Sequence, residues 1–252
     1  MTVTGERVVT SSGGFNPTWQ RHVAAYALCA PYLGPGRIAD IGCGIGHSYE
    51  LLAPRDTVGV DVDPRVLEGQ RRETVAADMR RLPFADGEFD GAIAVHSIEH
   101  VPDADAALRE IRRVLKPGAV VVLVTPNRLT FARPDEVIDP YHYVEYDPVE
   151  LAALSRRRFE SVEMAGIFGS DRYRAISARE RARLDRLLRC DPLRVRRLLP
   201  RRARQRLYDW RLRRERAASD PEATAITVED FTLGDRRLES ALDLVAVCRA
   251  MT

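Results

Sequence analysis

The sequence predicts an α/β fold built on a doubly wound, mostly parallel sheet. Apolar strand candidates alternate with amphipathic helix candidates along residues 37–124, which is the order of a parallel sheet with crossover helices. A glycine-rich turn follows the first strand, and acidic residues stand at the ends of the next two. Because ligands of such sheets bind beyond the carboxyl ends of the strands, we expect these residues to share one site.

The first strand and its turn lie in residues 37–52. A short apolar strand runs into Asp40, and an amphipathic helix begins after His47. Between them three glycines alternate, at Gly42, Gly44 and Gly46. Glycine suits positive φ or close approach to a ligand, and a helix start offers free N–H groups and a positive dipole end. The segment predicts a nucleotide-type binding corner, although its glycine spacing fits neither the dinucleotide fingerprint nor a P-loop.

The second and third strands are expected over residues 56–63 and 74–78, and each carries an acidic residue near its end. Asp61 is placed to accept hydrogen bonds from both hydroxyls of a ribose. Asp78 comes at the corresponding end of the third strand. The alternatives are an ordinary exposed strand end for Asp61 and a turn cap for Asp78.

The fourth strand is expected over residues 89–95 and the fifth over 119–124, with an amphipathic helix over 104–115 between them. The corner after the fourth strand reads His-Ser-Ile-Glu-His. If this corner starts a helix, its polar residues share one face. These residues are His96, Glu99 and His100.

The order of these motifs resembles the small-molecule branch of class I S-adenosylmethionine (SAM)-dependent methyltransferases. The Asp-x-Gly-x-Gly-x-Gly turn matches their first motif, and the strings at 82–90, 98–103 and 113–118 match later ones; the resemblance covers roughly residues 35–168. It implies SAM as the cofactor, with the adenine amino group at Asp78 and Met79. The implied cofactor contacts are Asp40, Gly42, Cys43, Gly44, Gly46, Asp61, Val62, Asp78, Met79, Val95 and His96.

The resemblance also implies how the chain is organised. The Rossmann-like core at residues 35–170 would hold a seven-stranded sheet, with a sixth strand over 159–164. The last strand, antiparallel, would lie in residues 236–252. Residues 1–34 would form a helical lid, and 171–235 an arginine-rich helical insert. The lid contacts would be Phe15, Trp19, His22 and Tyr26, and plain packing of an extra helix is the alternative.

The insert carries a large excess of positive charge. Residues 171–216 hold 18 arginines and six acidic residues, a local charge of +12 in a chain of net charge +2. Leucines at helical spacing predict two or three amphipathic helices with cationic outer faces. These faces are either solvated or form a cap that recognises a phosphate- or carboxylate-bearing acceptor.

Residues 96–100 resemble the Glu-x-x-Glu-His string of ubiquinone-type O-methyltransferases, some of which use it with a later histidine to hold a divalent cation. Glu99 and His100 match this string, His142 lies in a comparable later place, and His96 replaces the first glutamate. The resemblance implies that His100 acts as a base, or that Glu99, His100 and His142 hold a metal. A structural role for these residues is the alternative.

The loop over residues 125–146 should emerge on the ligand face, since it follows the fifth strand. Its aromatic residues are expected to wall a pocket. They are Tyr141, Tyr143 and Tyr146.

Composition limits the number of domains and the cellular location that can be expected. The 252 residues are 45% hydrophobic, which suffices for one large domain. The four cysteines lack metal-binding or disulfide spacing, and neither a signal peptide nor a membrane-length apolar run is apparent. A cytoplasmic location is therefore expected.

These observations predict O-methylation of a small or medium-sized acceptor such as a sugar, a phenol or an anionic glycolipid precursor. One alternative is an RNA methyltransferase that uses the arginine-rich insert, although no RNA-binding motif supports it. The other is a catalytically silent SAM-binding partner protein.

Overall fold

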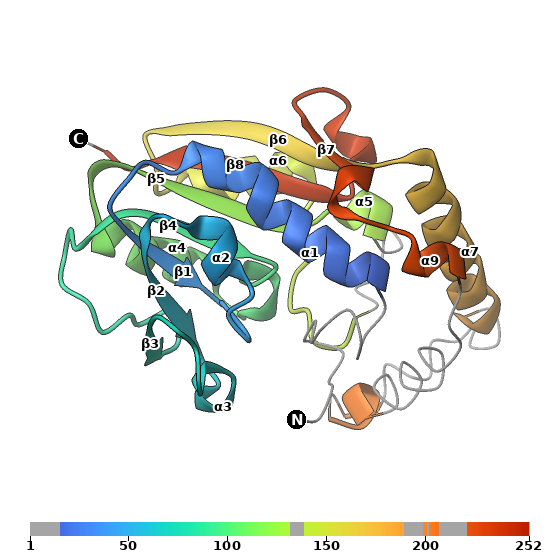
Figure 1. Ribbon diagram of the computed structural model, residues 1–252, viewed down its shortest axis with the longest axis horizontal. Coiled ribbons are helices and arrows are strands. Elements are labelled where there is room, and N and C mark those ends of the chain that lie inside the picture. Colours follow the sequence, from blue (N-terminus) through green and yellow to red (C-terminus); the bar gives the residue numbers. More distant parts are fainter. Residues whose placement is uncertain (1–15, 132–138, 189–198, 201, 207–220, 252) are drawn as a thin grey trace.

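An eight-stranded sheet lies at the centre of the computed structural model (Figure 1). The structure describes residues 16–131, 139–188, 199–200, 202–206 and 221–251. The strands follow the order β3-β2-β1-β4-β5-β8-β6-β7. Their bounds are β1 (Arg37–Ile41), β2 (Asp56–Asp61), β3 (Glu73–Ala76), β4 (Phe89–Val95), β5 (Leu115–Pro126), β6 (Ser161–Gly169), β7 (Phe231–Gly234) and β8 (Asp243–Arg249).

The strands β1 to β5 pair in parallel, which confirms the predicted doubly wound order. β8 runs antiparallel between β5 and β6, as predicted for the last strand. The sheet has one strand more than the seven predicted, because β7 pairs antiparallel with β6 at the edge. β7 lies inside the segment that was expected to be a helical insert.

Helices cover both faces of the sheet (Figure 1). α1 (Asn16–Cys29) and α2 (Ser48–Leu52) pack on one face, and α4 (Ala104–Val114) and α6 (Pro148–Arg156) on the other. Strand β4 shows why both faces are covered. Its Ile93 and Val95 pack in the apolar cluster beneath α1 and α2, whereas Ala92 and Ala94 pack in the cluster beneath α4 and α6. A strand buried on both faces reads as a continuous apolar run, as these strands do.

Further helices lie outside these layers. They are α3 (Pro64–Leu67), α5 (Arg128–Phe131), α7 (Asp171–Leu188), α9 (Pro221–Thr224), and the 3₁₀ turns η1 (Ala30–Tyr32), η2 (Ile98–His100), η4 (Val228–Asp230) and η5 (Leu238–Ser240). Of the arginine-rich segment, the structure describes α7 and a few residues near 200; the rest of its predicted helices lie outside the described residues. No helix in the described ranges is both long and apolar enough to cross a membrane.

Candidate functional site

A pocket of about 310 Å³ opens at the carboxyl ends of β1, β2 and β4, where the sequence predicts the ligand site. Its volume is in the range of small-molecule sites. Helix α1 contributes His22 and Tyr26 to its wall. The predicted cofactor contacts that line it are Gly42, Cys43, Gly44, Asp61, Val62, Asp78, Met79, Val95 and His96.

The glycine turn has the backbone that its sequence predicts. Gly42, Gly44 and Gly46 all have positive φ, at 76°, 53° and 79°. A Cβ on Gly42 would come within 2.5 Å of the Cβ of Ser97, so no other residue fits there without movement. Gly46 does not line the pocket; a Cβ there would meet the side chain of Gln70, which donates to the Gly44 carbonyl at 2.8 Å. The prediction that Gly46 contacts the cofactor is therefore corrected to a role in shaping the turn.

The end of β2 presents an oriented carboxylate. Asp61 accepts the backbone N–H of Gly44 at 3.0 Å and that of Asp63 at 2.9 Å, one bond on each oxygen. Each carboxylate oxygen can accept a further hydrogen bond. Asp61 is therefore held in place with acceptor capacity directed at the pocket that it lines.

The acid of the first motif has a different place from the one predicted. Asp40 is fully buried and does not line the pocket. Its carboxylate accepts from Tyr26 Oη at 2.9 Å, from Ser48 Oγ at 2.5 Å and from Arg72 Nη2 at 2.8 Å. The predicted direct contact with the cofactor is corrected, because protein donors already occupy this carboxylate.

The turn after β3 places Asp78 and Met79 on the pocket wall. Asp78 also caps its own turn, since it accepts from the backbone N–H of Arg80 at 2.9 Å. The side-chain hydrogen bond from Arg80 lowers the pKa of Asp78, so the carboxylate is ionised at neutral pH.

The corner after β4 differs from the predicted helix. His96 has a left-handed φ of 47°, and only residues 98–100 form a 3₁₀ turn. His96 therefore does not share a face with Glu99 and His100. Its ring instead contacts His22 and Asp243, with 2.9 Å from Nδ1 to His22 Nε2 and 2.7 Å from Nε2 to Asp243 Oδ1.

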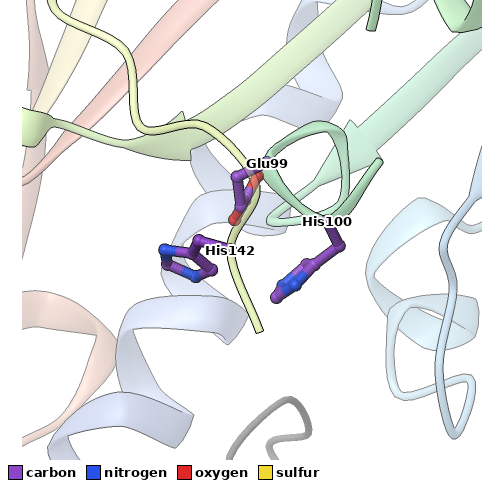
Figure 2. A group of neighbouring side chains, drawn as sticks. All are labelled: Glu99, His100 and His142. Atoms are coloured by element: carbon purple, nitrogen blue, oxygen red, sulfur yellow. The ribbon is translucent and has the colours of Figure 1, made fainter. Parts of the chain in front are cut away.

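Glu99, His100 and His142 do converge (Figure 2). One nitrogen or oxygen atom of each lies within 4.8 Å of the others, and the two rings are 4.9 Å apart at their centroids. Among the three, His100 lines the pocket. The predicted catalytic residues thus form a cluster beside the pocket, with His100 at its open side.

Polar neighbours orient this cluster. Glu99 is fully buried; its Oε2 accepts from Thr125 Oγ1 at 2.9 Å, while its Oε1 has no hydrogen-bond partner in the described part of the chain. His142 Nδ1 lies 2.9 Å from Glu145 Oε1. Burial opposes protonation of His142, but the hydrogen bond to Glu145 and the nearby acids raise its pKa above that of free histidine.

His47 is a polar pocket residue that was not predicted. His47 follows the last glycine of the turn, and its ring packs 4.9 Å from that of Trp19 and 5.3 Å from that of Tyr26. Both ring nitrogens are buried without a hydrogen-bond partner among the described residues. Burial lowers the pKa of His47 to about 4, so the ring is neutral at pH 7. Its only sequence signal is a polar ring directly after the motif glycines.

The predicted lid and aromatic wall are partly present. His22 and Tyr26 line the pocket, Trp19 reaches it through His47, and Phe15 lies outside the described residues. Among the tyrosines of the 125–146 loop, Tyr143 lines the pocket. The two others do not line it, which corrects that expectation: Tyr146 packs in the core, and Tyr141 meets the ring of His100 through its backbone carbonyl.

Known proteins resemble the chain in sequence and in fold. The model of a family described as a methyltransferase domain matches residues 39–123. A probable S-adenosylmethionine-dependent methyltransferase of Mycobacterium tuberculosis is 32% identical over 188 residues, which are 71% of this chain and 69% of that protein. An O-methyltransferase of Penicillium expansum is 33% identical over 124 residues, or 41% of this chain and 45% of that one.

A solved structure shares the fold. It is a SAM-dependent methyltransferase of Thermotoga maritima, described as a possible histamine N-methyltransferase, with a TM-score of 0.61 and 18% identity over 93% of this chain and 91% of that chain. The ordered motifs, the pocket at the strand ends and these similarities agree on the family and on SAM as the cofactor. The chain belongs to the class I S-adenosylmethionine-dependent methyltransferases.

Proposed function

We propose that this methyltransferase acts on an oxygen atom of a small or medium-sized metabolite. The observation that carries the proposal is the cluster of Glu99, His100 and His142, which places proton-accepting and ligand-type groups at the carboxyl end of β4. An alcohol or phenol needs such groups, because it must lose a proton when its oxygen is methylated. The O-methyltransferase of Penicillium expansum, similar over 124 residues, supports the same acceptor class.

The pocket residues suit the parts of SAM, which supplies a methyl group on a sulfonium when bound. Asp61 accepts the ribose hydroxyls, since two backbone amides already fix its orientation. Asp78 and Met79 hold the adenine, and the positive-φ turn at Gly42 and Gly44 brings backbone close to the ligand. Positioning accounts for much of the barrier reduction in a displacement of this kind.

His100 is suited to hold the acceptor oxygen. Its Nδ1 lies 3.3 Å from the carbonyl oxygen of Tyr141, which can only accept, so this contact favours a proton on Nδ1. Nε2 then keeps its lone pair. That nitrogen can bind the hydroxyl of the acceptor directly and take its proton, or it can serve as a ligand to a metal.

The residues of the cluster also fit a divalent cation. The unpartnered Oε1 of Glu99, buried beside two imidazoles, is the type of atom that a cation would satisfy. The contact between His142 and Glu145 matches the outer carboxylates that orient metal-binding histidines. A cation held by Glu99, His100 and His142 would acidify the hydroxyl of the acceptor.

An acceptor screen tests the proposal. The purified chain is incubated with [methyl-¹⁴C]SAM and with sugars, phenols, anionic glycolipid precursors and, as a rival acceptor, RNA. We expect label in hydroxylated small molecules, and a His100→Ala variant should lower the rate about 100-fold or more. Label found only in RNA, or in no acceptor at all, would contradict the proposal.

A chelator then separates the two roles of His100. If the cluster holds a cation, EDTA should abolish turnover and added Mg²⁺, Mn²⁺ or Zn²⁺ should restore it. Activity that is indifferent to the chelator would exclude the cation and leave proton acceptance to a histidine of the pocket.

A further inference from the structure

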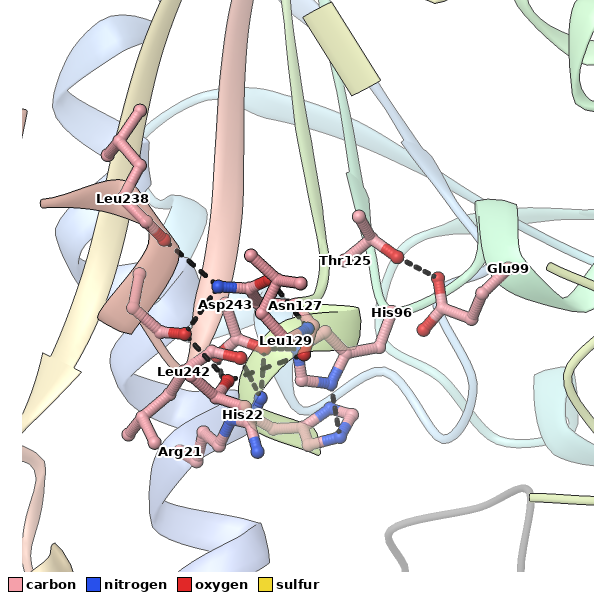
Figure 3. Close-up of polar contacts among 12 residues, drawn as sticks. Arg21, His22, His96, Glu99, Thr125, Asn127, Leu129, Leu238, Leu242 and Asp243 are labelled. Atoms are coloured by element: carbon pink, nitrogen blue, oxygen red, sulfur yellow. Dashed lines mark hydrogen bonds and ion pairs between the residues drawn. The ribbon is translucent and has the colours of Figure 1, made fainter. Parts of the chain in front are cut away.

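Four side chains from three parts of the sequence form one continuous hydrogen-bonded line beside the pocket (Figure 3). Asp243, fully buried at the start of β8, binds Arg21 of α1 through Nε–Oδ2 at 2.7 Å and Nη2–Oδ1 at 2.5 Å. His96 Nε2 lies 2.7 Å from Asp243 Oδ1, and His96 Nδ1 lies 2.9 Å from His22 Nε2. The line thus runs from a buried ion pair to His22, which lines the pocket.

When His96 is neutral, the chemistry of these groups fixes where the protons lie. An ionised carboxylate only accepts, so His96 Nε2 carries the hydrogen that binds Asp243. Nδ1 of neutral His96 then accepts the Nε2 hydrogen of His22. Nδ1 of His22 is left with a lone pair, and no hydrogen bond to it occurs within the ranges that the structure describes.

The charges around the line agree with this assignment. Burial opposes ionisation of Asp243, yet Arg21 and His96 hold the pKa of its carboxyl well below the usual range. Burial and the neighbouring rings of His96 and His47 lower the pKa of His22 well below that of free histidine; Arg21 acts in the same direction and Asp243 against it. His22 is therefore neutral at pH 7 and able to accept a proton.

The histidines are not needed to complete the buried ion pair. Arg21 already gives Asp243 two hydrogen bonds and donates a third to the carbonyl of Leu242 at 2.7 Å. His96 reaches the carboxylate from a left-handed backbone conformation, with φ at 47°, which non-glycine residues rarely adopt. Such strain persists where the surrounding structure enforces it, and it clusters at functional sites.

We propose that His22, His96 and Asp243 form a proton relay in which His22 is the catalytic base that deprotonates the acceptor. The inference rests on the proposed oxygen acceptor. As the new O–C bond forms and the S–C bond breaks, the hydroxyl proton passes to Nδ1 of His22. The Nε2 proton of His22 moves to Nδ1 of His96, and the resulting imidazolium is paired with Asp243. His96 and Asp243 are positioning residues, as an aspartate is for its histidine in a catalytic triad.

The relay and the Glu99 cluster have separate tasks. His100 and His22 line the same pocket, His100 just after β4 and His22 on α1. When a cation occupies Nε2 of His100, the lone pair of that nitrogen is no longer available for a proton. The relay supplies the second group, which receives that proton.

The test is long-range ¹H–¹⁵N NMR of the histidine rings in the full chain bound to S-adenosylhomocysteine. Because the chain has five histidines, their ring signals are few enough to be assigned in the unmodified chain from through-space contacts with neighbouring residues. At pH 7.5 we expect His22 to be neutral with its proton on Nε2, and His96 to carry a proton on Nε2. A proton on Nδ1 of His22, or a charged His22 at this pH, would overturn the relay. This measurement needs no variant, so it stands even if a variant fails to fold.

An Asp243→Asn variant tests the coupling. Loss of the negative charge should lower the pH at which the His22–His96 pair takes up a proton by about one unit or more. The matched control is Asp230→Asn, because Asp230 is also buried and paired with an arginine, Arg172, but contacts no histidine ring in any described range. An unmoved titration in Asp243→Asn, or an equal shift in the control, would contradict the relay.

The turnover of a His22 variant tests the relay independently of the proposed O-methylation. On an acceptor found in the screen, His22→Ala should lower kcat about 100-fold and leave KM for SAM within threefold, and imidazole should restore part of the rate. Unchanged kcat would overturn the relay and leave O-methylation intact. A screen without an oxygen acceptor would instead refute the proposed function, while the NMR result still decides the proton arrangement.

Discussion

At the scale of single residues, we propose that the pocket has a part that binds the cofactor and a part that serves the acceptor. Asp61 represents the first part, because its two oxygens are each fixed by one backbone amide and still face the pocket. All five histidines of the chain gather at the second part: four line the pocket, and the ring of His142 contacts that of His100. The acid–base capacity of the molecule is therefore concentrated at one place.

Replacing Asp61 with alanine should weaken the binding of S-adenosylhomocysteine by a factor of about 10 to 100, because charge-assisted hydrogen bonds to the ribose are lost. Isothermal titration calorimetry measures this change. Asp56→Ala at the opposite end of β2 is the control, since its exposed side chain lies away from the pocket. Equal affinities of the wild type and Asp61→Ala would remove the ribose assignment.

His47 should make the fold sensitive to acid. Burial lowers its pKa in the folded chain to about 4, whereas the unfolded chain has the ordinary value of 6.5. Between these pH values the unfolded state binds more protons, so stability falls as the pH decreases from 6.5 towards 4. The loss reaches up to about 3 kcal/mol at pH 4.

Urea unfolding of wild type and His47→Gln between pH 7.5 and 4.5 checks this prediction. The variant should lose less stability over this pH range. Part of the dependence of stability on pH should remain, because His22 is also buried and neutral. Identical slopes in the two proteins would show that His47 is not the titrating group.

At the scale of elements, α1 is tied to the sheet and to the glycine turn by buried polar contacts. Tyr26 of α1, Ser48 of α2 and Arg72 before β3 all donate to the carboxylate of Asp40 in β1. Arg21 of α1 binds Asp243 of β8. The helix that covers the pocket is thus held at two points by carboxylates of strands.

Tyr26→Phe should destabilise the chain by about 1–3 kcal/mol, because the buried carboxylate of Asp40 loses one of its three side-chain donors. Urea denaturation of the ligand-free protein gives this value. Tyr32→Phe serves as the control, since Tyr32 lies just after α1 and is exposed. If Tyr32→Phe lost as much free energy of unfolding as Tyr26→Phe, the role of the Asp40 contacts would be refuted.

The elements that the sequence predicts well are those with a strong local pattern. β1, β2, β4 and β5 follow from apolar runs that are buried, and the capping box of Asp147 and Glu150 marks the start of α6. β7 was missed because its four residues carry no alternation of their own and depend on pairing with β6. The turn at His96 was missed because a left-handed non-glycine residue has no sequence signature.

At the scale of the whole molecule, the cofactor site follows from the sequence more directly than the acceptor site does. Gly42, Asp61 and Asp78 recur at the strand ends that any doubly wound sheet brings together. The pair of Arg21 and Asp243 joins positions 222 residues apart, and only the antiparallel placement of β8 reveals it. The proposed acceptor side therefore depends on the complete fold: α1, β4 and the 125–146 loop supply pocket residues, and β8 supplies the carboxylate that binds His96.

The most direct test of the proposed O-methylation is to identify the atom that receives the methyl group. The purified chain, [methyl-¹³C]SAM and the acceptor fraction from the screen are combined, and the product is analysed by ¹³C NMR. The account predicts a labelled methyl carbon bonded to oxygen, formed together with S-adenosylhomocysteine. A labelled methyl on nitrogen, carbon or sulfur as the sole product would contradict it.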